Sequence, residues 1–225
     1  MQKADFISLA RSHREQYTPS GNVANQLAQV DLLAIVGPTG AGKTTLMNKL
    51  NIPFVVSDVT RKQRPSEIGG QNYRFRTDYD QLAREIESGE FVQYVINDTG
   101  EFYGTHSSAY PQSGWCMMAI IAVAIEQFRR LGFRNVRNIY IVPPNFEEWM
   151  RRVQAVSADN IAGRLKEAAT SLEIALQDPS YIFVVNDDID RALTEIERIV
   201  AGEILDSGQM LFARETAASL LQYLK

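Results

Sequence analysis

Apolar and polar positions alternate along this chain in a way that predicts strands separated by helices. Five short apolar runs have the length and composition of buried strands, and they lie at 31–36, 54–56, 116–123, 136–142 and 181–185. Between them, apolar residues recur at the three- and four-residue spacing of helices, over about 43–50, 125–132, 147–155, 161–177 and 189–201. This order favours an α/β fold of three layers, in which a parallel five-stranded sheet carries helices on both faces.

The segment at 58–108 breaks this alternation and has the pattern of a small mixed-β region. A short helix is predicted at 81–88, and the strand predicted at 90–96 is followed by a turn at Asp98-Thr99-Gly100. We therefore expect an inserted substrate-binding domain here. The other predicted parts are an N-terminal extension at 1–30, a core at 31–57 and 109–202 with a helical lid at about 153–161, and a C-terminal helical extension at 203–225.

Composition narrows the classes of function. The chain has 225 residues, of which 45% are hydrophobic and 22% charged, which is ordinary for a globular protein with a substantial core. Its net charge of −4 gives no general attraction to nucleic acids or anionic membranes, so we expect neither as a partner. The longest apolar run, 115–125, is too short to span a bilayer, and no signal segment begins the chain. We therefore expect a cytoplasmic protein.

The cysteine and the histidines indicate no chemistry of their own. Cys116 is the single cysteine and lies in an apolar run, which favours a buried structural thiol over a nucleophile. His13 and His106 are far apart in the sequence and match no metal-ligand spacing, so we expect solvated or loop positions for both.

A glycine-rich motif follows the first predicted strand and opens the first predicted helix. It reads Gly37-Pro38-Thr39-Gly40-Ala41-Gly42-Lys43-Thr44-Thr45 and matches the P-loop pattern G-x-x-x-x-G-K-[ST]. The glycines let backbone N–H groups point into one cavity, together with the positive end of the helix. Lys43 can then reach the β- and γ-phosphates of a nucleoside triphosphate, and the Thr44 hydroxyl can bind Mg²⁺. The alternative is a glycine turn that only closes a βα unit.

Positive charge is concentrated after the second predicted strand, although the protein is acidic. The basic residues there are Arg61, Lys62, Arg64, Arg74, Arg76 and Arg84. A solvated loop accounts for Lys62 and Arg84. Arg61 and Arg64 instead follow a strand end, where α/β proteins place ligands, and guanidinium groups can bind a phosphate monoester through two parallel hydrogen bonds. From the residues alone, a phosphate site and a solvated loop stay equally open.

With these motifs the chain resembles the guanylate kinase family of nucleoside monophosphate kinases, from about Leu32 to Ala201. Four blocks carry the resemblance in the family's order: the P-loop at 37–45, Thr-Arg-x-x-Arg…Glu…Gly-x-x-Tyr-x-Phe at 60–75, Tyr-Gly-Thr at 103–105 and Val-Asn-Asp-Asp-Ile-Asp at 185–190. The second block is the most diagnostic, because many NTPases share a P-loop. The resemblance implies a P-loop kinase that uses ATP and Mg²⁺.

The resemblance also implies a role for each matching residue. The acceptor's monophosphate would be bound by Arg61, Arg64, Tyr73 and Tyr103, with Glu67 in the same block, and its base would lie near Ser57, Gln93 and Thr105. Asn186 and Asp187 match a turn near the donor adenine. Arg152 and Arg164 match arginines that neutralise phosphate charge and would be catalytic with Lys43, with a surface ion pair as the alternative for each arginine.

Three features depart from the family's pattern. Gln93 stands where the family usually has a Glu that accepts from the guanine N–H edge, and an amide offers a donor as well as an acceptor. Ala122-Val123-Ala124 stands at the family's Asp-x-Asp, whose acids serve guanine and the phosphate–Mg²⁺ region; Glu126 and Asp98 are the candidate replacements. The lid segment 154–161 lacks the family's further arginine. The first two departures point away from ordinary GMP recognition.

The leading hypothesis is a nucleoside monophosphate kinase that transfers the γ-phosphoryl group of Mg·ATP to GMP, dGMP or a related nucleotide. One alternative is a nucleotide-binding or protein-interaction module that has kept the scaffold and lost turnover. Ala122-Val123-Ala124 favours this alternative, and the intact P-loop opposes it. A second alternative is a P-loop kinase for another phosphorylated acceptor, which Gln93 would permit. The sequence leaves the oligomeric state open.

Overall fold

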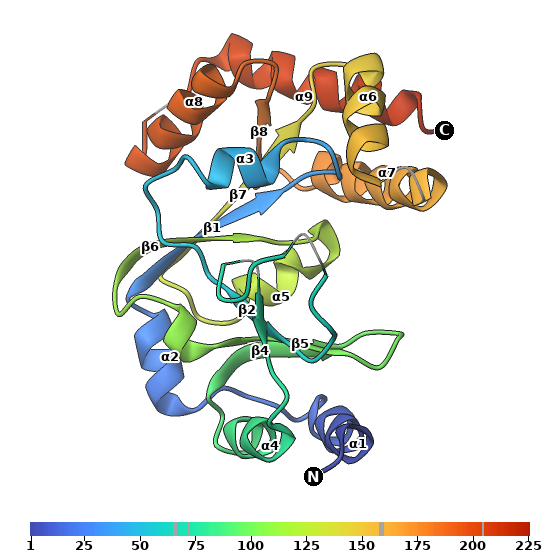
Figure 1. Ribbon diagram of the computed structural model, residues 1–225. Coiled ribbons are helices and arrows are strands. Elements are labelled where there is room, and N and C mark those ends of the chain that lie inside the picture. The colour runs from blue at the N-terminus through green and yellow to red at the C-terminus, as the bar shows by residue number, and fades with distance from the viewer. Residues whose placement is uncertain (65–66, 72, 158–159, 204) are drawn as a thin grey trace. The chain divides into compact units, whose positions relative to one another are not determined.

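The computed structural model describes residues 1–64, 67–71, 73–157, 160–203 and 205–225 (Figure 1). The chain forms two compact units. We call residues 1–31, 53–116 and 131–134 the small-sheet unit, and residues 32–52, 117–130 and 135–225 the P-loop unit. The predicted lid at about 153–161 includes residues 158 and 159, which lie outside the described residues.

The larger sheet has the strand order β6-β1-β7-β8. Its strands are β1 (Val30–Val36), β6 (Gly114–Ala119), β7 (Asn135–Val142) and β8 (Tyr181–Val185). Strands β7 and β8 run parallel, with Tyr140 opposite Phe183. Every residue of β1 is buried, as expected for a strand with elements packed on both faces. The predicted α/β fold with a parallel sheet is confirmed.

The number of strands in this sheet differs from the prediction. Among the described residues the sheet has four strands rather than five, and the run predicted as a strand at 54–56 contributes only a single-residue bridge at Phe54. Pro53 precedes this run and has no N–H to donate to a neighbouring strand. Phe54 is also exposed, whereas a central parallel strand is buried on both faces. The run follows the boundary between residues 52 and 53 and belongs to the small-sheet unit, where it leads into β2.

The P-loop unit contains most of the predicted helices. They are α3 (Lys43–Met47), α5 (Ile125–Arg129), α6 (Phe146–Ser157), α7 (Ile161–Gln177), α8 (Ile189–Ala201) and α9 (Ser207–Gln222), with a 3-10 turn η2 (Ala122–Ala124) before α5. The sheet face that carries Tyr140 and Phe183 meets α7 and α9. The Tyr140 hydroxyl donates to Ser171 Oγ at 3.1 Å, and the Arg214 guanidinium lies 5.6 Å from the Phe183 ring centre.

The small-sheet unit is built on a second, mixed sheet with the order β3-β2-β5-β4. Its strands are β2 (Ser57–Val59), β3 (Tyr73–Phe75), β4 (Phe91–Ile96) and β5 (Phe102–His106). Strand β2 runs parallel to β3 and antiparallel to β5, and β4 and β5 are antiparallel. The helices of the unit are α1 (Lys3–His13), α2 (Gly21–Leu27) and α4 (Tyr79–Glu87), with a 3-10 turn η1 (Ser107–Ala109).

Helix α1 is part of the core of the small-sheet unit. Figure 1 shows it beside α4, in the same unit as the mixed sheet. Its buried residues Phe6, Ile7 and Ala10 pack in one cluster with apolar residues of α4, β4 and β5, and the rings of Phe6 and Phe102 are 5.5 Å apart. The apolar positions of this helix at three- and four-residue spacing explain its packing in this unit, to which residues 1–31 belong.

Part of the basic segment is used inside the small-sheet unit. Asp58 is fully buried and accepts hydrogen bonds from Arg74 Nη2 at 2.6 Å and Arg76 Nη1 at 2.8 Å. Arg76 also donates to both carboxylate oxygens of Glu85. A buried carboxylate requires such partners. Arg74 and Arg76 therefore stabilise the fold, whereas Lys62 and Arg84 are exposed, as predicted.

Two further predictions concern burial. Cys116 is fully buried, as expected, and burial raises the pKa of its thiol to about 12. In the part of the chain that the structure describes, every helix is too short or too polar to cross a bilayer.

Candidate functional site

The glycines of the P-loop adopt backbone conformations that other residues avoid. Gly37, Gly40 and Gly42 have φ angles of 141°, 80° and 92°. A Cβ atom on Gly37 would lie 2.5 Å from the carbonyl oxygen of Ile141, and one on Gly42 would lie 2.2 Å from Asn186 Nδ2. The turn therefore needs glycine both for its positive φ angles and for the space that it leaves.

Lys43 lies over this loop. Its Nζ donates to the carbonyl oxygens of Gly37 at 2.6 Å and Pro38 at 2.9 Å. Burial lowers the pKa of Lys43 to about 8; the carboxylate of Glu167 opposes this shift and Arg164 adds to it. Thr44 and Thr45 follow on α3 with exposed side chains. The loop thus carries one ammonium group and the Thr44 hydroxyl that the motif assigns to phosphate and Mg²⁺.

Side chains from α6 and from the residue that follows β8 hold the backbone of the P-loop. Asn186 Nδ2 donates to the carbonyl oxygen of Ala41 at 2.8 Å, and Trp149 Nε1 donates to that of Thr39 at 2.8 Å. Arg152 in turn donates to the carbonyl oxygen of Asn186 at 3.1 Å and to Glu148 at 2.7 Å. Asn186 and Arg152, both predicted site residues, are therefore brought to the loop.

Trp149 is a contact that the sequence analysis missed. It lies on the amphipathic helix α6, where a buried tryptophan is ordinarily a core residue. No spacing in the sequence indicates that its N–H meets a carbonyl group of a loop 110 positions away.

Asp187 and Arg164 were also predicted at the site. Asp187 precedes α8 and forms an ion pair with Arg191 in the first turn of that helix. Arg164 Nη1 donates to Glu167 at 3.0 Å, and its Nε is buried and has no hydrogen-bond partner among the residues that the structure describes.

A cavity of about 530 Å³ opens beside Lys43 within the P-loop unit. Three segments line it: the P-loop, the end of β6 with η2, and the α7 residues from Gly163 to Ser171. The wall formed by 119–123 is entirely apolar, with Ile121 59% and Val123 61% exposed. Ala122 and Val123 line the cavity at the family's Asp-x-Asp position, so Glu167 of α7 is the only carboxylate among its described lining residues.

The two candidate replacements for the missing acids are Glu126 and Asp98. Glu126 is bound to arginines of its own helix, and Asp98 lies in the other unit. Glu126 accepts hydrogen bonds from Arg130 at 2.8 Å and from Arg129 at 3.5 Å. Asp98 belongs to the small-sheet unit, in the turn between β4 and β5. Neither side chain lines the cavity in the described part of the chain.

The predicted acceptor residues of the strands share one face of the mixed sheet. Ser57 is opposite Tyr73, Val59 is opposite both Phe75 and Tyr103, and Gln93 is opposite Thr105. Directly opposed residues point to the same face, and so do residues two apart in one strand. Ser57, Tyr73, Gln93, Tyr103 and Thr105 therefore face the same side, although they span nearly fifty positions of sequence.

Thr105 links two neighbours on this face. Its Oγ1 accepts from Gln93 Nε2 at 3.5 Å and from the buried Tyr110 hydroxyl at 3.0 Å. The long Gln93 contact leaves most of the hydrogen-bonding capacity of this half-buried amide unused within the unit.

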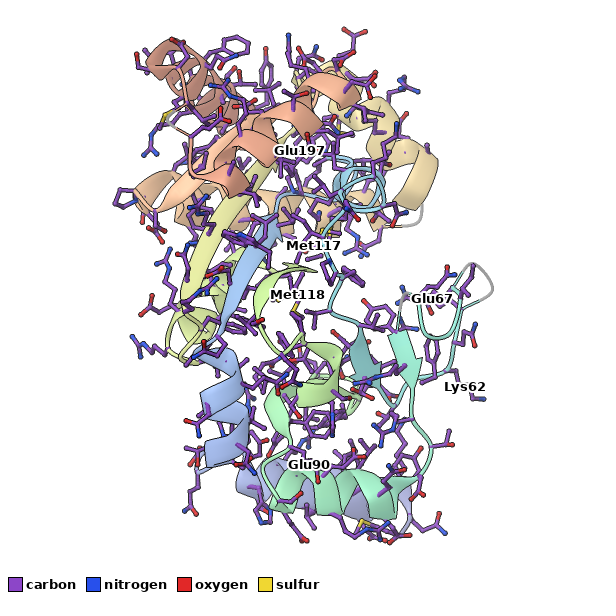
Figure 2. The ribbon with its side chains drawn as sticks, turned by 90° about the vertical axis from the view of Figure 1, so that its left-hand side faces the viewer. Lys62, Glu67, Glu90, Met117, Met118 and Glu197 are labelled. Carbon is purple, nitrogen blue, oxygen red and sulfur yellow. The ribbon has the colours of Figure 1, made fainter. Side chains whose placement is uncertain are left out.

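Arg61 is at the centre of a cluster on the same unit. Its guanidinium donates to the two carboxylate oxygens of Glu67 at 2.7 and 2.6 Å, and its Nε donates to Tyr103 OH at 3.1 Å. The guanidinium also lies 4.8 Å from the ring centre of Tyr73. Figure 2 shows Glu67 on the loop before β3 and Lys62 directed outward. The hydrogen bonds from Arg61 hold the pKa of Glu67 at about 2.

Arg64 joins this cluster through its backbone. Its amide donates to Glu67 at 2.9 Å, while its side chain is exposed. Four of the five residues predicted around the acceptor's phosphate thus meet through their side chains, and the fifth presents an exposed guanidinium from the same loop.

The strand, glycine loop and helix at 30–47, with a lysine folded over the loop, define a P-loop α/β protein. The family model described as guanylate kinase matches residues 29–203. The guanylate kinase of Trichormus variabilis is 34% identical over 184 residues, covering 76% of this chain and 89% of that protein. That of Paraburkholderia xenovorans is 32% identical over 199 residues, covering 84% and 87%.

A solved structure agrees with these relatives. The crystal structure of guanylate kinase from Anaplasma phagocytophilum superposes with a TM-score of 0.53 at 25% identity, over 86% of this chain and 97% of that one. The chain belongs to the guanylate kinase family. Helix α9 lies beyond the matched residues, and so do α1 and α2.

Proposed function

We propose that the protein transfers the γ-phosphoryl group of ATP to a nucleoside 5′-monophosphate. The donor phosphates bind the loop amides of 37–45 and Lys43. The acceptor's phosphate binds Arg61, Arg64, Tyr73 and Tyr103, and its base lies near Ser57, Gln93 and Thr105. The small-sheet unit is then the acceptor-binding part of the molecule.

The observation that carries this proposal is the common face of the mixed sheet. Strand register alone brings Tyr73 and Tyr103 to one side, and Arg61 contacts both. A guanidinium flanked by phenol groups offers the planar donors and hydroxyl groups that suit a phosphate monoester. A solvated loop would leave Arg61 exposed, yet its side chain is only 12% exposed.

The donor set beside the P-loop fits Mg²⁺ together with a triphosphate. Mg²⁺ prefers hard oxygen ligands and usually binds through one or two protein groups plus substrate phosphates. The Thr44 hydroxyl is exposed at the start of α3, and Glu167 supplies a carboxylate in the adjoining cavity. When bound, Mg²⁺ neutralises charge on the β- and γ-phosphates.

Cationic side chains stabilise the negative charge on the phosphoryl group during the proposed transfer. Phosphoryl transfer needs little covalent help from the protein, so most of the rate enhancement comes from positioning and from charge around the moving group. Lys43 and Arg164 line one cavity, and Arg152 is anchored at the loop through Asn186. We assign these three residues to charge neutralisation during transfer.

The base of the acceptor is the finer part of the proposal. The relatives named above are guanylate kinases, so GMP and dGMP are the first acceptors to test. Guanine presents N–H donors at the edge that the family's Glu meets, and the Gln93 amide can accept from only part of it. A base whose edge mixes donors and acceptors would satisfy this amide better.

The proposal is tested by coupling ADP release to an optical readout with Mg·ATP and a panel of ribo- and deoxynucleoside monophosphates. Lys43→Ala is expected to lower kcat by about 100-fold or more, as for loss of one preorganised cationic donor. Lys49→Ala is the matched control, because Lys49 is an exposed lysine in the segment after α3. A wild-type protein that releases ADP with none of the acceptors would contradict the proposal.

A second function is favoured by the apolar wall of the cavity. Ala122 and Ala124 replace acids, and Ile121 and Val123 expose apolar surface beside the P-loop. These residues suit a guanylate kinase-like module that binds nucleotide with weak or no turnover. In that case, calorimetry would detect nucleotide binding that Lys43→Ala abolishes, while the ADP-release assay stayed at background.

A further inference from the structure

The cavity beside Lys43 has a carboxylate on the wall formed by α7, and the other described lining residues carry none. Glu167 lies on α7 and lines the same cavity as Gly37 and Lys43. The facing wall from β6 and η2 is apolar at every lining position. Among the described residues that line the cavity, Glu167 is therefore the one acidic group.

The position of Glu167 is fixed by its helix. Ala168 and Leu172 of α7 are buried, and Ser171 accepts a hydrogen bond from Tyr140 of β7. On the exposed side, Arg164 one turn earlier donates to Glu167 Oε2 at 3.0 Å. The carboxylate lines the same cavity as Lys43, whose ammonium group contacts the loop.

A carboxylate at this place has an unfavourable interaction with a bare polyphosphate. Two anionic groups in one cavity repel each other, and the repulsion is strongest where water is displaced. A divalent cation between them reverses the sign, because hard oxygen ligands from both sides bind it. Nucleotide and metal then bind cooperatively, and the carboxylate sets the size of the coupling.

We propose that Glu167 makes binding of the donor nucleotide depend on Mg²⁺, in place of the acids that are missing at Ala122 and Ala124. The inference rests on the proposed function, since it takes the P-loop ligand to be a triphosphate. Glu167 acts directly on the metal or through a water bound to it. Arg164 positions the carboxylate.

The test is the dissociation constant of ATP without an acceptor, measured by isothermal titration calorimetry in EDTA and in excess Mg²⁺. The quantity compared between variants is the ratio of the dissociation constant in EDTA to the dissociation constant in excess Mg²⁺. The affinity of Mg²⁺ for free ATP is the same for every variant and cancels in this comparison. Glu167→Gln keeps the shape of the side chain and removes its charge. It is expected to tighten metal-free binding, weaken metal-bound binding and lower the ratio by about 10-fold or more, the range for lost metal-site partners.

Two further variants make the test specific. Glu173→Gln changes the same charge on the same helix at an ion pair with Lys225, and it is expected to leave the ratio unchanged. Arg164→Gln removes the positioning partner while Glu167 stays, so it is expected to lower the ratio less than Glu167→Gln. The midpoint of thermal unfolding of each variant shows that the fold is retained.

The outcomes separate this inference from the proposed function. Suppose that ATP binding by the wild type depends on Mg²⁺ and that Glu167→Gln has the same ratio as the wild type. This result overturns the inference and leaves the proposed function standing. Equal changes in both constants mean that Glu167 only positions Arg164, which also overturns it. A folded wild-type protein that binds no ATP in either condition overturns both.

Discussion

Glu67 holds Arg61 by both of its carboxylate oxygens, at 2.7 and 2.6 Å from the two terminal nitrogens of the guanidinium. The Nε–H of Arg61 donates to the Tyr103 hydroxyl at 3.1 Å, its Nη1 also donates to the carbonyl oxygen of Lys62 at 3.0 Å, and the Tyr73 ring lies 4.8 Å from the guanidinium carbon. The direction of the guanidinium is therefore fixed before any ligand binds. In the proposed acceptor site, Glu67 is a positioning residue that acts through Arg61.

Glu67→Gln is expected to raise the KM for the acceptor nucleotide by about 10-fold, which corresponds to one lost charge-assisted hydrogen bond of about 1.5 kcal/mol. An amide can accept from only one arm of the guanidinium and turns an NH₂ group toward the other. Initial rates at varied acceptor and at varied ATP measure the effect. Only the KM for the acceptor should change.

The control for this prediction is Glu87→Gln, an exposed glutamate on α4 in the same unit. It should leave both KM values as in the wild type. Equal increases in the KM for ATP and for the acceptor in Glu67→Gln would show that Glu67 supports the fold in general rather than the acceptor site.

Lys43 gives the protein a pH dependence above neutrality. Its pKa in the free protein is lowered to about 8. A neutral amine cannot pair with phosphate, so the affinity for ATP should fall as the pH rises from 7.5 to 9.5, with a midpoint near the lowered pKa. Titration of ATP at a series of pH values measures this. Lys43→Arg stays charged over the whole range and should give a flat profile.

The same group affects stability with a definite sign. Between about 8 and the ordinary lysine value of 10.5, the unfolded chain binds more protons at this position than the folded chain. The Lys43 contribution therefore makes the free energy of unfolding increase with pH in this window. Lys43→Met should remove that increase in denaturant unfolding. If the slope persists in Lys43→Met, another group is responsible for it.

Periodicity explains how much of the fold could be predicted from the sequence. The apolar strand ending at Val36 and the P-loop after it are local signals, and the structure has both. Features that depend on the spacing of apolar residues or on a local motif could therefore be predicted from the sequence. The common face of Tyr73, Tyr103 and Gln93 depends on how β3, β2, β5 and β4 pair, and this register was not predicted from the sequence.

Contacts between residues far apart in the chain could not be predicted from the sequence. The bonds from Asn186 and Trp149 to the P-loop backbone join side chains to carbonyl groups more than a hundred positions away, and no repeat or motif marks them. The run at 54–56 was apolar enough for a fifth strand, but Pro53 and an exposed Phe54 make it a connection. Glu167 escaped notice because an acid on a helix is ordinarily a solvated residue.

Gln93 provides the test of base preference. Gln93→Glu replaces an amide that both donates and accepts by a carboxylate that only accepts, on the same face as Thr105 and Ser57. The N–H edge of guanine then meets two acceptors, whereas a base edge that requires a donor from the protein loses it. We expect the kcat/KM for GMP, relative to the other monophosphates, to rise by at least about 10-fold.

The measurement is kcat/KM for each monophosphate in wild type and Gln93→Glu, with Gln16→Glu as the control. Gln16 is an exposed glutamine of the same unit and lies outside the strands of the mixed sheet, so its substitution adds the same charge away from the strand positions assigned to the base. A general effect of the added negative charge would weaken all monophosphates together and would appear in both variants. If kcat/KM for GMP relative to the other monophosphates is the same in wild type and Gln93→Glu, this side chain does not face the base, because a mismatched polar contact in a desolvated site changes selectivity far more than it changes overall rate.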